Sequence, residues 1–449
     1  MGEKKRLFQK LSPTQTILFS FIAVILLGTL LLCMPFSSES GEWTSFVTAF
    51  FTATSATCVT GLVVVQTSTY FSLAGQIIIL CLIQAGGLGI MTIFSVFSVM
   101  FAHSSSLRHR NIAKQAAGAI NYDGIRSLLF RVFIGTFLIE VIGAAVLCIR
   151  FIPEHGVKIG IKYAVFTSIS AFCNAGFDIF GASSLVPFNA DALVMLTIAG
   201  LIILGGIGFI VWMDFTKHRF KFAYYSLHSK IALTMTGALL TIGTALFLFT
   251  EFDAAFAEMT FPQKLLNAFF QSTTLRTAGF SAVDQAELSD GGVLLSYFLM
   301  VIGGSSGSTA GGLKTTTFAV IVFTFIANLK RNEHVGAFKR RLPTETTKAA
   351  LSIVMSYAAI LVIATLAILS IDKNTPNANL SNVVFEAISA IATVGVSRGI
   401  TASLSVASKL ILVLLMFVGR VGSFTFMLAF ARPSAVSTIL RPKENILIG

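Results

Sequence analysis

Residues 51–61 read FTATSATCVTG, and three later stretches of the chain follow the same pattern. Each stretch begins with phenylalanine ten residues before a final glycine and has a hydroxyl side chain six residues before that glycine. The other three are FTSISAFCNAG (166–176), FFQSTTLRTAG (269–279) and FEAISAIATVG (385–395). The glycines are Gly61, Gly176, Gly279 and Gly395, and the hydroxyl residues are Ser55, Ser170, Thr273 and Ser389. Four occurrences in one chain indicate an internal repeat.

The segments around each stretch are strongly apolar. Only 12% of the 449 residues are charged, whereas soluble domains carry roughly 25%. An apolar run precedes each stretch, and its length is close to the roughly 20 residues that cross a bilayer as a helix. A second apolar segment with central glycines follows each stretch. The preceding runs are 16–33, 133–149, 231–249 and 353–369, and the glycine clusters are QAGGLG (84–89), LGGIG (204–208), IGGSSGSTAGG (302–312) and VGRVG (418–422).

The repeated stretch is itself too short to cross a membrane. We therefore expect the chain to dip into the bilayer, form a half-length helix, turn at the glycine and leave again. Irregular backbone is tolerated at that depth only where it is buried in protein or lines a wet cavity. The sequence predicts an all-α membrane protein, a single domain over 1–449 with four helix–pore loop–helix repeats and eight spanning segments around one central ion pathway. The predicted repeats are approximately 13–101, 126–214, 230–329 and 345–431.

The charges are distributed unevenly along the chain. Most Lys and Arg lie in five polar segments, whereas the segments that alternate with them hold most of the acids. This is the positive-inside pattern, which predicts cytoplasmic termini and basic loops. It also explains the net charge of +12 without nucleic-acid binding. The basic segments are 1–12, 102–126, 214–230, 329–348 and 431–449.

Four pore loops of this kind suit cations. A dehydrated cation needs replacement oxygens, and rings of backbone carbonyls supply them in ion filters. Glycine permits positive φ, so carbonyls can turn toward the axis. Four half-helices that point their C-termini inward each add about −0.5 charge. A single glycine would more simply be a turn or a packing contact, but four in register favour a filter.

The pore loops resemble those of the Trk/Ktr/HKT superfamily of potassium transporters. The resemblance rests on TCVTGL (57–62), FCNAGF (172–177), TLRTAGF (274–280) and ATVGVSRG (392–399). The segments IGGSSGSTAGGLKTTT (302–317) and FVGRVGSFTF (417–426) are similar to the bacterial Ktr membrane subunits. The resemblance implies a potassium-translocating subunit of the bacterial cell membrane, and Gly61 argues for potassium over sodium. It places ion-facing carbonyls at Thr57, Cys58, Val59, Thr60 and Gly61; Cys173, Asn174, Ala175 and Gly176; Arg276, Thr277, Ala278 and Gly279; and Thr393, Val394 and Gly395.

The glycine cluster of the third repeat predicts a broken helix. Glycine costs about 1 kcal/mol relative to alanine inside a helix, and half of residues 303–312 are glycine. The resemblance implies a mobile intramembrane loop that obstructs the pore; a glycine-rich packing helix is the alternative. Arg420, a charged residue within a membrane helix, is the expected donor to the free carbonyls of the loop, with Lys314 as a second cation. The predicted gate comprises Gly303, Gly304, Ser305, Ser306, Gly307, Ser308, Thr309, Ala310, Gly311, Gly312, Lys314 and Arg420.

Arg276 is a positive residue inside a predicted cation filter. It either tunes ion occupancy or, as we expect, points away and ties its loop to a carboxylate or to carbonyls. The run 303–307 also matches the GxSxG nucleophile motif, but none of the six histidines lies near the middle of a span. We therefore predict no enzymatic activity, with an intramembrane hydrolase as the remote alternative.

A sodium- or proton-coupled symporter is the alternative transport mechanism. A buried carboxylate pair would favour proton coupling, and Glu140 and Glu386 are the acids in apolar or pore-helix surroundings. No covalent cofactor is expected; potassium is the substrate, and sodium is a candidate activator. The resemblance further implies a membrane homodimer in the lipid bilayer and a cytosolic ring of nucleotide-binding subunits.

Overall fold

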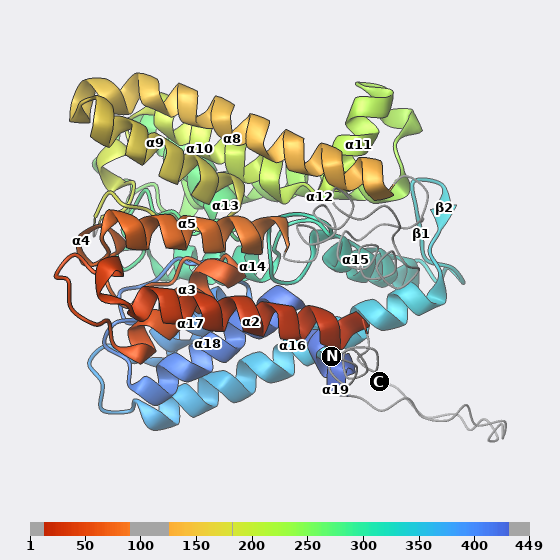
Figure 1. Ribbon diagram of the computed structural model, residues 1–449. Helices are drawn as coiled ribbons and strands as arrows, with labels where there is room; N and C mark the ends of the chain where they lie inside the picture. Colours follow the sequence, from red (N-terminus) through yellow and green to blue (C-terminus); the bar gives the residue numbers. More distant parts are fainter. Residues whose placement is uncertain (1–12, 90–124, 182, 431–449) are drawn as a thin grey trace, which may run out of the picture.

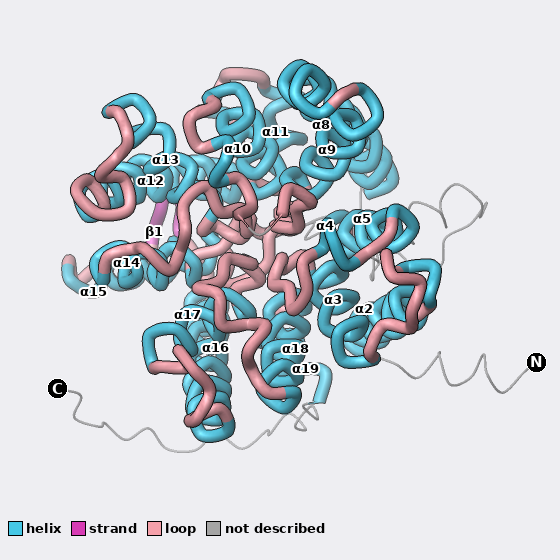
Figure 2. Tube along the Cα trace, turned by 90° about the vertical axis from the view of Figure 1, so that its left-hand side faces the viewer, coloured by secondary structure: helices cyan, strands magenta, loops and turns pink. Residues whose placement is uncertain are grey.

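The computed structural model describes residues 13–89, 125–181 and 183–430 of the chain. Its long helices run side by side in one common direction (Figure 1). In the view along these helices, the helices surround a central group of loops (Figure 2). The fold is therefore helical and built around a loop-lined centre.

Three helices recur in the same order four times. A long helix comes first, a shorter one follows and returns toward the centre, and a third leads away again. The long helices are α2 (Pro13–Cys33), α8 (Ile125–His155), α12 (Leu227–Thr250) and α16 (Thr344–Ile371). The short helices are α3 (Phe46–Cys58), α9 (Val157–Phe172), α13 (Phe261–Thr274) and α17 (Leu380–Ile391). The third helices are α5 (Leu73–Leu88), α10 (Ala192–Gly206), α14 (Asp290–Val301) and α18 (Val406–Val421).

Smaller elements connect these helices. They include α11 (Phe209–His218), α15 (Thr315–Leu329) and the single-turn α4 (Thr67–Tyr70), while α19 (Ser423–Phe430) follows α18. A two-stranded antiparallel hairpin, β1 (Gly336–Ala337) and β2 (Arg340–Arg341), follows α15. The described residues also include the short 3-10 helices η1 (Pro35–Ser37), η2 (Val186–Phe188) and η3 (Phe222–Tyr224).

The long helices have the length and composition of membrane spans. Within the described ranges, four helices are long and apolar enough to cross a bilayer, and they lie in α2, α8, α12 and α16. Helices α10 and α11 would add a fifth if they form one span, although they are bent by 93° at their junction. Of the remaining third helices, α5 and α14 are shorter apolar segments. These features support a multi-pass membrane protein.

Glycine ends the third helix in three of the repeats. Gly89, Gly208 and Gly422 follow α5, α10 and α18 with φ of 81°, 98° and 96°, a backbone region that glycine enters at little cost. In the third repeat, α14 ends at Val301 and the chain continues as a loop before α15. The break predicted for the third repeat thus has counterparts between α10 and α11 and between α18 and α19.

Polar caps fix the distance between the first and third helices of a repeat. Ser289 caps α14, and its hydroxyl donates to the buried Glu251 at the end of α12 over 2.6 Å. Ser405 caps α18, and its hydroxyl donates to Asp372 at the end of α16 over 3.0 Å. An N-cap contributes about 1 kcal/mol, and here the same serine also fastens the neighbouring helix.

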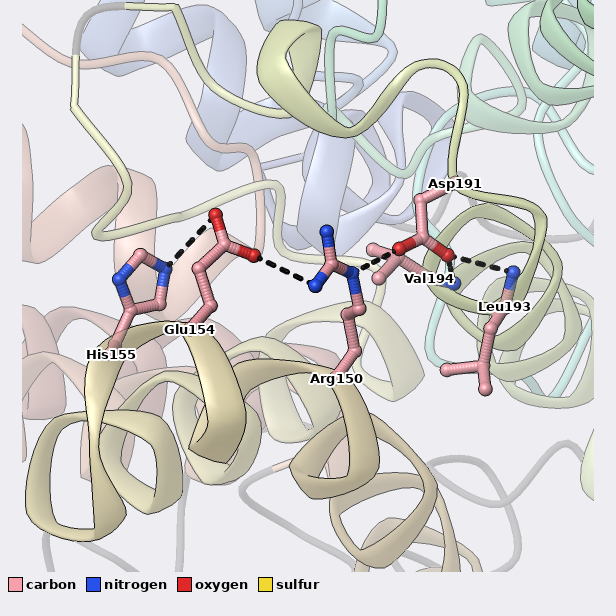
Figure 3. Close-up of polar contacts among 6 residues, drawn as sticks. All are labelled: Arg150, Glu154, His155, Asp191, Leu193 and Val194. Carbon is pink, nitrogen blue, oxygen red and sulfur yellow. Dashed lines mark hydrogen bonds and ion pairs between the residues drawn. The ribbon is translucent and has the colours of Figure 1, made fainter.

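The second repeat makes this connection through an ion pair (Figure 3). Asp191 caps α10 by accepting from the backbone N–H groups of Leu193 and Val194 at 3.0 and 3.2 Å. The Nε of Arg150 on α8 lies 2.5 Å from Asp191, and Arg150 also pairs with Glu154 at 3.3 Å. An exposed pair contributes at most about 1 kcal/mol, so the cap is the firmer part of this contact.

Candidate ion-conducting site

The four glycines of the repeated stretches meet in a closed ring. A Cβ built on any one of them would lie within 3 Å of the carbonyl oxygen that precedes the glycine of the next loop. No side chain therefore fits at these positions. Such a Cβ would lie 2.6 Å from Ala175 O at Gly61, 2.8 Å from Ala278 O at Gly176, 2.5 Å from Val394 O at Gly279 and 1.9 Å from Thr60 O at Gly395.

Each loop has two positive-φ residues. The glycines have φ between 69° and 99°, and the residue two positions earlier is also left-handed. These earlier residues are not glycine, and a left-handed conformation costs them roughly 1–2 kcal/mol each. Such strain persists where the surroundings enforce it, often at functional sites. The residues are Val59, Asn174, Thr277 and Thr393, with φ of 57°, 58°, 67° and 52°.

Hydroxyl groups of the short helices hold the loops from behind. Ser170 and Ser389 donate to the carbonyls of Phe177 and Val396 at 2.6 and 2.7 Å. Ser55 instead accepts from the backbone N–H of Gly61 at 3.1 Å. These buried bonds fix the turn in which each glycine lies.

In the third loop, the structure corrects the alignment of the four repeated stretches by one residue. Thr273, the predicted equivalent, bonds only the carbonyl of Phe269 in its own helix at 2.8 Å. Thr274 instead donates to the carbonyl of Phe280 at 2.7 Å, as the serines do in the second and fourth loops. Phe270 is also fully buried, like the phenylalanines that begin the other stretches, whereas Phe269 is partly exposed. The third loop therefore has one residue fewer between its hydroxyl anchor and its glycine.

Glycines of the third helices allow close contact with the short helices. A Cβ on Gly86, Gly205 or Gly419 would lie about 2 Å from a carbonyl oxygen at the C-terminal end of a short helix. The helix ends thus point their partial negative charge toward the ring while packed tightly from outside. The carbonyls are those of Thr57, Phe172 and Ile391, each four residues before its ring glycine.

A cavity of about 780 Å³ lies against the ring on one side. The four ring glycines and residues that follow them in each loop line it, so the ring forms part of its wall. Asp178, Asp284 and Glu287 give this cavity acidic groups, and Arg398 adds one basic group. Burial raises the pKa of Asp178 to about 6, despite hydrogen bonds from Ser184, Phe180 and Gly181 that lower it.

The loop 303–312 contacts the residues that precede the ring glycines. The backbone N–H groups of Ser305 and Thr309 donate to the end of α10 at 2.9 and 3.2 Å. The Thr309 hydroxyl donates to the carbonyl of Phe172 at 3.1 Å. A Cβ on Gly311 would lie 2.0 Å from the Thr393 hydroxyl of the fourth loop. The loop therefore lies against the ring on the side away from the cavity.

Two positively charged side chains donate hydrogen bonds to carbonyls of this loop. Arg420 donates to the carbonyl of Thr309 in the loop and also to those of Gly86 and Gly87 in the first repeat. Lys314 donates to the carbonyl of Ala310 at 2.6 Å and to that of Gly311 at 3.3 Å. Arg420 thus joins the fourth repeat to the third and the first, and no pattern in the sequence predicts the contact with the first.

Arg276 extends outward from the ring to two other helices. Its guanidinium donates to the hydroxyls of Thr236 on α12 and Thr315 at the start of α15, at 3.3 and 3.4 Å. The expected direction of the side chain agrees with this placement, but the partners are hydroxyls rather than a carboxylate or carbonyls.

The described residues give little support to proton coupling or to an intramembrane hydrolase, the alternatives raised by the sequence. Glu140 accepts from Gln84 at 3.2 Å, whereas Glu386 accepts from Thr401 at 2.8 Å, so these acids have separate partners. The hydroxyl of Ser305 has no hydrogen-bond partner within the part of the chain that the structure describes. His228 contacts the backbone of the neighbouring Ser306 instead.

The known proteins to which this chain is similar are described as cation or potassium transport proteins. The model of the TrkH family, described as a cation transport protein, matches residues 3–438. The potassium/sodium uptake protein NtpJ of Enterococcus hirae is 40% identical over 99% of both chains. The Ktr system potassium uptake protein B of Vibrio alginolyticus is 41% identical over 96% of this chain and 94% of its own length. The crystal structure of the potassium transporter TrkH from Vibrio parahaemolyticus has a TM-score of 0.72 at 17% identity, covers 92% of this chain and 84% of that one, and shows likeness of fold.

Proposed function

We propose that this chain, which belongs to the TrkH family of cation transport proteins, is the potassium-translocating membrane subunit of a bacterial potassium-uptake system. The closed ring of four glycines, each against a carbonyl of the next loop, carries the proposal. Potassium would replace its hydration shell with carbonyls of the four loops. The acidic cavity would collect cations at one face of the ring, and the converging helix ends would disfavour anions.

In the membrane, the proposed arrangement has eight spanning segments, four pore loops and both termini in the cytoplasm. The cavity faces outward in this arrangement, and the hairpin β1–β2 faces the cytoplasm. A membrane-impermeant thiol reagent should then label a cysteine placed at position 284 in intact cells, but not one at position 339. Labelling at position 339 in sealed cells would reverse the proposed topology.

The loop 303–312, together with Lys314 and Arg420, serves in this proposal as the gate. Its contacts with the second and fourth repeats place it against the ring on the side opposite the cavity. Glycine-rich backbone can adopt several conformations of similar energy, which suits a switch.

Sodium remains part of the proposal in two forms. One relative is described as a potassium/sodium uptake protein, so sodium as an activator or a coupled ion belongs to the same test. Proton coupling is less favoured, because Glu140 and Glu386 do not pair. Because the relative from Vibrio alginolyticus is described as part of a Ktr system, we also propose a membrane homodimer controlled by a cytosolic nucleotide-binding ring.

Flux into liposomes that contain this chain alone tests the proposal. Vesicles loaded with potassium should take up tracer rubidium, and external potassium should compete more strongly than sodium. Equal competition by both ions would instead indicate a non-selective cation pathway. Absence of flux from vesicles with verified protein, both with and without sodium, would contradict a pathway within this subunit.

A further inference from the structure

Arg398 links the fourth loop to the third repeat. It lies three residues after Gly395, at the edge of the cavity. Its Nε donates to the carbonyl of Gln285 at 3.1 Å, and its Nη2 donates to that of Ala286 at 3.2 Å. Its Nη1 donates to the hydroxyl of Ser381, in the first turn of α17, at 3.1 Å. One guanidinium therefore ties the fourth loop to the segment 285–286 and to the start of α17 by charge-assisted hydrogen bonds, which are stronger than neutral ones.

Glu386 fixes the backbone at the base of this side chain. It is fully buried in α17 and accepts from the backbone N–H of Arg398 at 3.2 Å. It also accepts from the hydroxyls of Ser397 and of Thr401, the latter at 2.8 Å. The segment after Gly395 is thereby held from both of its ends.

The third repeat continues the same network. Gln271 follows Phe270 in α13 just as Glu386 follows Phe385 in α17. The Gln271 and Gln285 side chains are buried and donate to each other at 2.6 and 3.3 Å. Because Arg398 binds the Gln285 carbonyl, the buried groups of both repeats form one continuous chain of bonds.

In the described part of the first two repeats, threonine stands at the positions of Glu386 and Gln271. Thr52 and Thr167 occupy the positions that follow the buried Phe51 and Phe166. Their hydroxyls are buried and have no hydrogen-bond partner among the residues described. Among the described residues, the chain of bonds that runs through Arg398 and the two glutamines therefore lies between the third and fourth loops.

We propose that Arg398 and Glu386 are positioning residues for ion selectivity, which join the third and fourth loops into one rigid unit. This proposal rests on the ring being the potassium filter. The junction between these loops is tight, because a Cβ on Gly279 would lie 2.5 Å from Val394 O. Cations of different radius need different oxygen spacing, so loosening the two loops should weaken selectivity more than transport.

Charge and tethering can be separated at Arg398. Arg398→Met removes both the donors and a positive charge from the cavity, whereas Arg398→Lys keeps the charge but cannot reproduce the planar fork of three donors. A change of charge alone alters the local concentration of all monovalent cations equally. Loss of the tether instead changes the ratio between potassium and sodium.

The experiment measures competition of potassium and sodium for rubidium uptake into liposomes, with wild type, Arg398→Lys, Arg398→Met and Glu386→Gln. Thr167→Val is the matched control behind the second loop. The preference for potassium over sodium should fall about fivefold in both Arg398 variants, which is the change expected from losing hydrogen bonds of ordinary net strength. We expect a smaller decrease for Glu386→Gln, which retains an acceptor, and no change for Thr167→Val.

Two outcomes would overturn the proposal while leaving the filter assignment intact. One is a wild-type ion preference in Arg398→Lys. The other is a change in Arg398→Met that affects both ions equally. Because Arg398 lies at the cavity edge, its variants should fold, and their elution as a single species in detergent is checked first. A wild-type protein without potassium-selective flux would instead refute the proposed function.

Discussion

Replacing Arg420 by alanine should open the proposed gate. In the structure, this side chain donates to the carbonyl of Thr309 within the loop 303–312 and to those of Gly86 and Gly87 outside it. The bonds to Gly86 and Gly87 join parts of the chain that need not move. Only the bond to Thr309 favours the loop conformation that lies against the ring, so that bond determines the expected effect.

The magnitude follows from the strength of a single charged hydrogen bond. Such a bond contributes about 1.5–3 kcal/mol net, and each 1.4 kcal/mol is a tenfold change in an equilibrium constant. If the loop is closed most of the time, the variant should have roughly 10- to 100-fold more open protein and a similar rise in basal flux. Selectivity should stay as in wild type, because the ring carbonyls are not bonded to Arg420.

The assay is rubidium uptake into liposomes at matched protein content, without any partner subunit. Deletion of 303–312 gives the upper limit of flux, and Arg420→Lys is the conservative control. A lysine keeps the charge but has no fork to reach both Thr309 and Gly86, so intermediate flux is expected. If Arg420→Ala conducts no faster than wild type while the deletion does, the arginine does not hold the loop. If neither variant conducts faster, the loop is structural packing.

Three further outcomes are expected. Gly61→Ser should weaken discrimination of potassium over sodium, because its φ is 97° and an added Cβ would lie 2.6 Å from Ala175 O; unchanged ion competition would remove Gly61 from the filter. Thr274→Val should alter selectivity more than Thr273→Val, since only the former loses the bond that anchors its loop; equal effects would contradict the corrected alignment. Burial raises the pKa of Asp372, but hydrogen bonds from serine and threonine outweigh it and leave that pKa below the usual value. The ionised Asp372 carboxylate therefore stabilises the folded protein above the unfolded pKa of about 3.9, and this stabilisation is lost as the pH falls through the folded pKa. The difference in unfolding midpoint temperature between wild type and Asp372→Asn should shrink below about pH 4, and a difference that stays constant with pH would contradict this account.

The ring glycines can be predicted from sequence because their positions accept no other residue type. A residue with positive φ that lies against a neighbouring carbonyl has no room for a side chain. Gly61 and its three equivalents are therefore glycine in the sequence. The sequence pattern misaligns the third loop by one residue because FFQSTT offers two phenylalanines and two threonines. Only burial distinguishes Phe270 from Phe269, and burial depends on the neighbouring repeats.

Contacts between repeats cannot be predicted in the same way. The bonds of Arg420 to the first repeat, and those of Arg398 to the third, join backbone carbonyls that carry no residue-type signal. The predicted partners of Arg276 are also wrong in kind, because two threonines from different helices converge on it. Such contacts are set by how the repeats pack around the centre.

The closure of the ring has a consequence for biosynthesis. Its last side joins Gly395 to Thr60, and the nearby bond from Arg420 to Gly86 spans 334 positions of sequence. At about 5–20 residues per second, the ribosome needs roughly 17 to 67 seconds to make the intervening chain. During that interval the loops already made can be in the bilayer without their fourth neighbour. A truncated product therefore has an open-sided centre whose carbonyls lack their partners, which makes an incompletely translated chain a natural substrate for membrane quality control.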